Sequence, residues 1–286
     1  MKVSTTIAEV RSQVKEWKRQ GLSVGLVPTM GYLHEGHQSL IARAARENDR
    51  VVVSVFVNPI QFGPSEDLES YPRDFERDCT LCEKTGADLV FHPEASEMYA
   101  ENFCTYVDMD RLTKGLCGAS RPVHFRGVCT VVSKLFHIVT PDRAYFGQKD
   151  AQQLAVIKRM VRDLSMDVEI VGCPIIREPD GLAKSSRNTY LSPQERRAAV
   201  VLSQALAEGR KALAEGERSA QAITGIIRGV LESEPLAQPE YVELVDWETL
   251  EPVETADRPV LAAIAVRIGT TRLIDNFVFE EGPECN

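Results

Sequence analysis

Strand-like and helix-like patterns alternate regularly through the first two-thirds of this 286-residue chain. The clearest strand, residues 51–57, is almost entirely valine, as parallel strands are when helices cover both of their faces. The clearest helix, residues 5–20, repeats apolar side chains every three or four positions from Ile7 to Trp17. This order of strand and helix predicts an α/β fold with a doubly wound (Rossmann-like) parallel sheet.

The other elements of the series follow from the same periodicities. Further strands are predicted at 22–28, 88–92, 142–146 and 168–172, and further helices at 36–47, 74–85, 126–139 and 150–164. Ligands of such sheets bind beyond the carboxyl ends of the strands, near the point where the strand order reverses. We therefore expect the chemistry to lie in the loops that follow these strands.

The pattern changes after about residue 176. Two helices are predicted at 193–215 and 218–232, followed by strands at 241–246, 260–268 and 272–279, with Gly269-Thr270-Thr271 as a hairpin turn. Because these elements do not alternate, we expect a first domain at residues 1–176 and a smaller α+β domain at residues 177–286.

Charge, hydropathy and cysteine content restrict the class of protein. The net charge is −9, and residues 231–286 carry 13 acidic and 3 basic side chains, which argues against a nucleic-acid partner. The longest apolar run is too short to span a bilayer, and residues 1–5 lead into a polar helix without a signal-peptide core. Seven irregularly spaced cysteines indicate reduced thiols, so we expect a cytoplasmic enzyme with small-molecule substrates and no membrane partner.

One turn from strand to helix carries two histidines. Residues 28–37 read Pro-Thr-Met-Gly-Tyr-Leu-His-Glu-Gly-His, so His34 and His37 precede the helix predicted at 36–47 or lie in its first turn. Helix N-termini attract anions, and two imidazoles there suit a triphosphate whose α-phosphorus gains negative charge in the transition state. The alternative is one solvent-exposed histidine and one that only caps the helix.

Three further polar clusters favour the same interpretation. Asn58 and Gln61 follow the valine-rich strand and offer two amides for a polyol or hydroxy acid. Residues 147–153 supply a lysine for phosphate oxygens and an aspartate for a ribose hydroxyl, and residues 184–187, Lys-Ser-Ser-Arg, resemble a phosphate clamp. Each cluster alone fits a strand end, a solvated helix or a surface loop, but together with the histidines they indicate a nucleotide site.

These motifs also resemble those of a known family. H-x-G-H followed about 150 residues later by Lys-Ser-Ser-Arg is similar to the two signatures of the nucleotidylyl-transferase superfamily, which includes the class I aminoacyl-tRNA synthetases. The full set resembles the pantothenate synthetase (pantoate–β-alanine ligase) family, through residues 28–37, 58–62, 124–128, 146–153 and 180–188 in that family's order.

The resemblance implies an AMP-forming ligase with two half-reactions. The carboxylate of (R)-pantoate attacks the α-phosphorus of MgATP, which gives pantoyl adenylate and pyrophosphate. The amine of β-alanine then attacks the activated carbonyl, and pantothenate and AMP are released. The family further implies ATP as co-substrate, Mg²⁺ whose ligands the sequence does not identify, a homodimer, and a C-terminal domain that closes over an ATP- and pantoate-binding domain.

The resemblance also implies site residues. ATP would be bound by Met30, Gly31, Tyr32, Leu33, His34, Glu35, Gly36, His37, Gly147, Gln148, Lys149, Asp150, Ile176, Lys184, Ser185, Ser186 and Arg187. Pantoate and β-alanine would be bound by Asn58, Gln61 and Gln153, and the catalytic groups would be His34, His37, Lys149 and Arg187. His37 corresponds to the family's proton donor. A carboxylate that attacks phosphorus needs no strong base, so we expect His37 to contribute more through charge stabilisation than through proton transfer.

Two points stay open in the sequence. Lys184 stands where the family usually has methionine, and we expect its side chain to point to solvent while its backbone contacts ATP. Residues 121–128 are either a mobile flap or an ordinary loop that enters the next helix.

Two other functions also remain as alternatives. A related nucleotidylyltransferase acting on a phosphate-bearing substrate would need cations where the amides stand. A non-catalytic ATP-binding sensor would need neither those amides nor Arg187.

Overall fold

A computed structural model of the chain describes residues 1–64 and 66–280. The chain divides into two compact units. Unit 1 consists of Met1–Thr113, Arg121–Gln148 and Gln153–Pro174, and unit 2 of Lys114–Ser120, Lys149–Gln152 and the described residues from Ile175 onward. Two short segments from the first two-thirds of the chain therefore pack with the C-terminal elements.

Unit 1 is built on a six-stranded parallel sheet of order β1-β4-β3-β2-β5-β6. The strands are β1 (Lys2–Ser4), β2 (Val24–Thr29), β3 (Arg50–Val55), β4 (Leu89–Phe91), β5 (Arg143–Gly147) and β6 (Glu169–Cys173). The predicted parallel sheet is confirmed, and the edge strand β1 was missed because three residues are too few to show a period. The strand order reverses between β2 and β5, which makes their carboxyl ends the expected ligand position.

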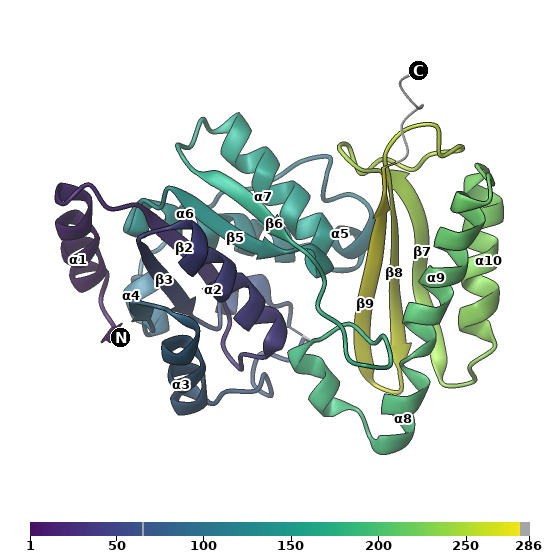
Figure 1. Cartoon of the computed structure of the whole chain (residues 1–286), viewed down its shortest axis with the longest axis horizontal. Coiled ribbons are helices and arrows are strands. Elements are labelled where there is room, and N and C mark those ends of the chain that lie inside the picture. Colours follow the sequence, from purple (N-terminus) through teal and green to yellow (C-terminus); the bar gives the residue numbers. More distant parts are fainter. Residues whose placement is uncertain (65, 281–286) are drawn as a thin grey trace. The chain divides into compact units, whose positions relative to one another are not determined.

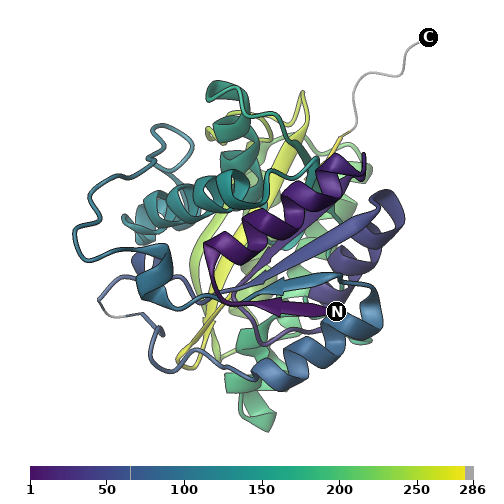
Figure 2. The same cartoon turned by 90° about the vertical axis from the view of Figure 1, so that its left-hand side faces the viewer.

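Helices cover both faces of this sheet. They are α1 (Ile7–Arg19), α2 (Glu35–Glu47), α3 (Phe75–Thr85), α6 (His124–Val139) and α7 (Ala151–Asp163), with the short α4 (Ala95–Met98). The 3₁₀ turns η1 (Pro59–Gln61) and η2 (Gln148–Asp150) follow β3 and β5, and the short helix α5 (Leu116–Ser120) belongs to unit 2. Within unit 1, α2 and α3 lie on one side of the sheet, and α1 and α6 lie on the other (Figures 1 and 2). This arrangement explains why β3 is buried from Val51 to Val55 and carries valine at four of these five positions.

The packing of α2 fixes the turn that carries the two histidines. Leu33 and Ile41 are fully buried with Val27 and Val53 of the sheet. Burying side chains of this size stabilises the fold by about 1.5–3 kcal/mol each. The N-terminus of α2 is therefore held firmly beyond the end of β2.

Unit 2 contains an antiparallel sheet of three strands in the order β7-β8-β9. Its elements are β7 (Ala237–Asp246), β8 (Val260–Ile268), β9 (Thr271–Phe279), the 3₁₀ turn η3 (Ser186–Tyr190), α8 (Pro193–Ala198), α9 (Val201–Ala214) and α10 (Ala220–Glu232). The continuous helix predicted at 193–215 is wrong, because the chain forms two helices, α8 and α9. Ala198, Ala199, Val201 and Leu202 all enter one apolar core, so the apolar pattern continues across the break and conceals it.

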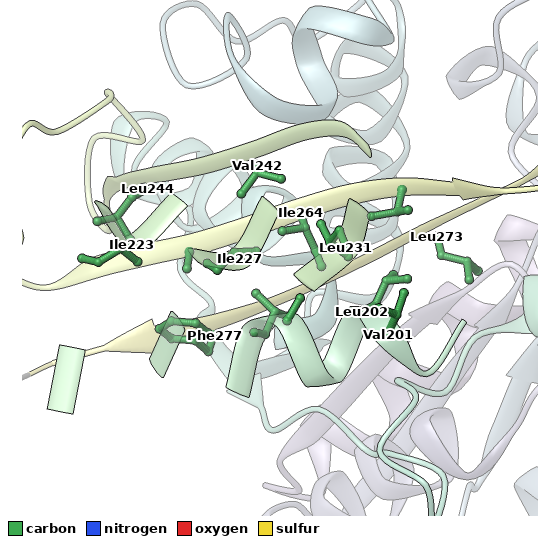
Figure 3. Close-up of a cluster of buried hydrophobic side chains, with 14 of the residues drawn as sticks. Val201, Leu202, Ile223, Ile227, Leu231, Val242, Leu244, Ile264, Leu273 and Phe277 are labelled. Atoms are coloured by element: carbon green, nitrogen blue, oxygen red, sulfur yellow. The ribbon is translucent and has the colours of Figure 1, made fainter. Parts of the chain in front are cut away.

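The apolar core of unit 2 lies between this sheet and the pair α9 and α10. Ile223, Ile227 and Leu231 line the inner face of α10, opposite Val242 and Ile264 of the sheet (Figure 3). The predicted hairpin between the last two strands is confirmed, since Ile268 pairs with Thr271. Gly269 adopts the positive φ of 60° that this two-residue turn requires.

Of the helices in the described part of the chain, none has the length and apolar character needed to cross a bilayer. The cysteines in this part are free thiols. Cys79 and Cys82 lie on α3, and burial raises the pKa of the Cys82 thiol to about 12. A thiol with so high a pKa carries almost no thiolate at neutral pH, so it is chemically inert.

Candidate active site

The two histidines of the H-x-G-H turn cap α2 together. His34 is the N-cap residue, and its Nδ1 accepts a hydrogen bond from the Gly36 backbone N–H at 3.1 Å. The His37 Nδ1 accepts from the His34 backbone N–H at 3.3 Å, and the ring centroids are 4.1 Å apart. Because both rings accept through Nδ1, each neutral imidazole carries its proton on Nε2 and is a donor there. Both histidines therefore take part in the cap and both are partly buried, so the alternative of one exposed and one capping histidine is wrong.

A buried aspartate that the sequence analysis missed supports this turn. Asp78 of α3 is 1% exposed and accepts the backbone N–H groups of Tyr32 and Leu33 at 2.8 and 2.7 Å. Gly31 has a φ of +83°, and a Cβ there would lie 3.0 Å from the Asp78 Oδ2. Asp78 lies 46 residues from Tyr32 in the sequence, inside a helical pattern, so no local signal marks it.

Asp78→Ala is expected to lower the free energy of unfolding by roughly 2–4 kcal/mol, because it leaves two buried N–H groups without an acceptor. Urea denaturation measures the loss, and Glu76→Ala on the exposed side of the same helix, expected to change stability by less than about 0.5 kcal/mol, is the control. An equal, small change in both variants would contradict the assigned role.

The same prediction has a pH dependence. Burial raises the pKa of the Asp78 carboxyl, outweighing the two backbone hydrogen bonds that lower it. A folded-state pKa above the unfolded one means that stability falls as the pH rises through the interval between the two values. Asp78→Ala lacks this loss, so the stability difference between the wild type and the variant should shrink as the pH rises through that interval.

The amides that follow β3 form a buried group. Asn58 is 1% exposed and Gln61 is 6% exposed. The Asn58 Nδ2 donates to the Gln61 Oε1 at 2.9 Å, and the Gln61 Nε2 reaches the Met30 Sδ at 3.1 Å. The structure thus brings the first amide cluster beside the H-x-G-H segment. Gln153 lies half-buried on α7, also in unit 1.

The 121–128 segment is a helix entry. Residues 124–128 are the first turn of α6, and Arg121 binds both carboxylate oxygens of Glu66 at 2.7 and 2.6 Å. Burial pushes the pKa of Glu66 up, but the hydrogen bonds and charge of Arg121 outweigh it and hold that pKa below its usual value. In this structure the segment has the form of a loop that enters α6.

Two neighbouring residues of β9 anchor candidate nucleotide-binding segments in unit 2. Asn276 donates to the backbone carbonyl of Lys149 at 2.8 Å, and Lys149 lies 3.5 Å from the Asp150 carboxylate. Asp275 binds Arg177 at 2.6 and 3.0 Å, and Arg177 also donates to the Gly181 carbonyl at 3.0 Å. The strand thus fixes the η2 turn and the start of the 181–187 loop, an arrangement that no motif in the sequence indicated.

The expectation that the Lys184 side chain points to solvent is wrong. Lys184 does not point to solvent: its Nζ lies 2.9 Å from the Glu178 carboxylate, and the two side chains are 18% and 24% exposed. Its backbone N–H donates to the Ile176 carbonyl at 2.9 Å. Ser185 caps η3 by accepting the Arg187 N–H at 3.3 Å. The lysine charge is therefore neutralised by a neighbour within the loop.

A parallel sheet with helix-capping imidazole donors at its switch point is the architecture of a nucleotide-binding α/β enzyme. The family model for pantoate–β-alanine ligase matches residues 2–278, so the chain belongs to the pantoate–β-alanine ligase family.

Close relatives match along the whole chain. The chain is 63% identical to the pantothenate synthetase of Ruminiclostridium cellulolyticum, over 98% of this chain and 99% of that one. It is similar in structure to the pantothenate synthetase of Thermus thermophilus, with a TM-score of 0.93, 48% identity and coverage of 97% and 99%. The pantoate–β-alanine ligase of Francisella tularensis, solved with β,γ-ATP and β-alanine, gives a TM-score of 0.80 at 32% identity, with coverage of 99% and 100%.

Proposed function

We propose that this chain condenses (R)-pantoate with β-alanine to form pantothenate, with ATP as co-substrate and pantoyl adenylate as intermediate. The pantoate carboxylate attacks the α-phosphorus and pyrophosphate leaves. The β-alanine amine then attacks the acyl carbon, and AMP leaves. The observation that carries this proposal is the pair of Nε2–H donors at the N-terminus of α2, beside the buried amide of Gln61, in a member of this family.

In this proposal His34 and His37 stabilise charge that develops on the α-phosphate. Both rings donate through Nε2, and the helix N-terminus adds a positive field. No strong base is required, because the attacking carboxylate is already ionised at neutral pH. Met30 to Gly36 of the same segment supply the surrounding nucleotide contacts, and Asp78 keeps their backbone in place.

Gln61 and Gln153 bind pantoate, and Gln61 also meets the incoming β-alanine. Amides suit a hydroxy acid because one group supplies both a donor and an acceptor. A substrate bearing a phosphate would instead call for cations at these positions, which speaks against the related nucleotidylyltransferases.

The proposal also assigns nucleotide contacts to charged residues of unit 2. Lys149 and Arg187 bind phosphate oxygens, Asp150 binds a ribose hydroxyl, and Ile176 contacts adenine through its backbone. Gly147, Gln148, Ser185 and Ser186 complete the contacts with ATP, and the backbone of Lys184 joins them. Arginine suits the phosphate role because its planar fork donates two parallel hydrogen bonds.

Mg²⁺ fits this site only as a companion of the nucleotide. The described residues contain no group of three His, Cys, Asp or Glu side chains that could hold a metal ion. Magnesium typically keeps several waters and binds through substrate phosphates with one or two carboxylates. The ion would enter with ATP and neutralise phosphate charge. We further propose a homodimer in the cytoplasm.

Isotope exchange between pyrophosphate and ATP tests the proposed function. With pantoate and ATP alone, labelled pyrophosphate should enter ATP, because the adenylate forms before the amine is needed. Exchange that appears only after β-alanine is added would contradict the stepwise mechanism. ATP binding without any exchange would instead indicate a sensor module.

A further inference from the structure

The amide of Gln61 belongs to a chain of hydrogen bonds that has a fixed direction. The Tyr99 hydroxyl donates to the Asn58 Oδ1 at 2.7 Å. The Asn58 Nδ2 donates both to the Gln61 Oε1 at 2.9 Å and to the Gly127 carbonyl at 3.2 Å. All of these residues lie in unit 1, so this series of hydrogen bonds is complete within one compact unit.

The Gly127 carbonyl sets the direction of this chain. A carbonyl oxygen only accepts hydrogen bonds, so the Asn58 atom facing it must be the NH₂ group. Both hydrogens of that group are then used, and the Gln61 atom that meets it must be the acceptor Oε1. The Gln61 NH₂ is consequently turned toward Met30, whose thioether is only a weak acceptor.

Gly127 must be glycine for its carbonyl to come this close. A Cβ there would lie 2.5 Å from the Gln61 Cα and 2.6 Å from the Ile60 carbonyl oxygen. Only a residue without a side chain lets the first turn of α6 pack directly on η1. His124, one turn earlier, also binds the Gln61 backbone carbonyl through Nδ1 at 3.1 Å, so both the main chain and the amide of Gln61 are held.

We propose that Asn58 and Tyr99 are positioning residues that lock the Gln61 amide with its NH₂ group toward the substrate, so that Gln61 selects an oxygen that accepts a hydrogen bond. The inference rests on the proposed function and deepens it, because the carboxylate and hydroxyl oxygens of a small hydroxy acid are such acceptors. Asn58 then acts through Gln61, and its burial at 1% exposure agrees with an indirect role.

Tyr99→Phe removes the first hydrogen bond of the series while keeping the aromatic ring. It should raise the KM for pantoate about tenfold, since Asn58 keeps the Gly127 carbonyl but loses the second partner that holds its amide in place, and it should leave kcat and the KM for ATP within about twofold. Tyr106→Phe is the matched control, because Tyr106 is 45% exposed and its ring contacts Arg126. The KM of the Tyr106→Phe variant for pantoate should equal that of the wild type. An unchanged KM in Tyr99→Phe, or equal rises for pantoate and ATP, would overturn the inference.

A double-mutant cycle separates positioning from a general loss of structure. In a Gln61→Ala background the hydrogen bonds of Tyr99 and Asn58 have no Gln61 amide to orient. Adding Tyr99→Phe should therefore leave the KM for pantoate within about twofold of that of Gln61→Ala alone. A further tenfold rise there would mean that Tyr99 acts on the fold and not through Gln61.

Asn58→Asp replaces the NH₂ group that faces Gln61 with an oxygen, so a donor becomes an acceptor. Aspartate offers only acceptors when ionised, so the Gln61 amide should rotate to meet it with NH₂ and present oxygen to the substrate. We expect a loss of pantoate-dependent kcat/KM of about a hundredfold, larger than for Asn58→Ala, with thermal unfolding as the check that both variants fold. A smaller loss in Asn58→Asp than in Asn58→Ala would overturn the assigned direction.

The wild-type protein distinguishes a failure of this inference from a failure of the proposed function. Absence of pantoate-dependent pyrophosphate exchange in the wild type overturns the proposed function and the inference with it. Exchange in the wild type together with an unchanged KM in Tyr99→Phe overturns the inference alone.

Discussion

His37→Ala is expected to lower the rate of adenylate formation by at least two orders of magnitude, about 2.7 kcal/mol, while the protein remains folded. The imidazole accepts the His34 N–H through Nδ1, so the neutral ring carries its proton on Nε2, the atom that would donate to a developing phosphate charge. The stability cost should be limited to the lost cap, about 0.5–2 kcal/mol. Single-turnover formation of adenylate from pantoate and ATP measures the effect directly.

The control for His37 is the same substitution at an exposed histidine of unit 1. His137→Ala on α6 removes an imidazole that binds the Ser133 carbonyl of its own helix, and it should leave adenylate formation within about twofold of wild type. Adenylate formation at a near-normal rate in His37→Ala would remove the histidine pair from the chemistry. A His37→Ala protein that unfolds at room temperature would assign His37 a structural role.

Arg187→Ala is expected to reduce kcat/KM for ATP by at least a hundredfold, whereas Lys184→Met should reduce it by less than about tenfold, or ~1.4 kcal/mol. Arg187 lies in η3, whose first turn is capped by Ser185, and its guanidinium suits bidentate phosphate binding. The Lys184 ammonium is already paired with Glu178 at 2.9 Å, so it has little charge to offer to a phosphate. Steady-state kinetics with varied ATP compare the two variants.

Glu178 provides the matched test for Lys184. In Lys184→Met the Glu178 carboxylate loses its partner, and its negative charge then repels phosphate, so part of any loss should come from Glu178. The double variant Lys184→Met, Glu178→Gln should therefore regain most of the wild-type kcat/KM. Equal losses in Lys184→Met and Arg187→Ala, without recovery in the double variant, would show that this chain uses Lys184 as a second phosphate-binding cation.

The main elements of the fold were predictable because each is encoded by a short-range pattern. Val51–Val55 is a buried strand, and the apolar stripe from Ile7 to Trp17 is an amphipathic helix, whatever the rest of the chain does. The same patterns failed where an element was too short to show a period or where the period continued across a break. The three residues of β1 are too short, and the break between α8 and α9 lies inside one continuous apolar face.

The nucleotide motif was also local, since His34 and His37 lie three residues apart and their capping geometry follows from the helix start. Chain connectivity alone places such a pair at the N-terminus of α2. The sequence therefore determined the parallel sheet, the position of the histidine pair beyond β2, and the types of residue available for phosphates and for a hydroxy acid.

Only the tertiary structure decided which distant partners orient those residues. Hydrogen bonds join Asp78 to Tyr32, Tyr99 to Asn58 and Asn276 to Lys149, although these pairs are 46, 41 and 127 residues apart in the sequence. The pairing of Lys184 with Glu178 likewise depends on how the chain folds back on itself at Gly181. A hydrogen bond is directional and of short range, so a partner is chosen by packing to within a few tenths of an ångström. Residue types and periodicity carry no record of that choice.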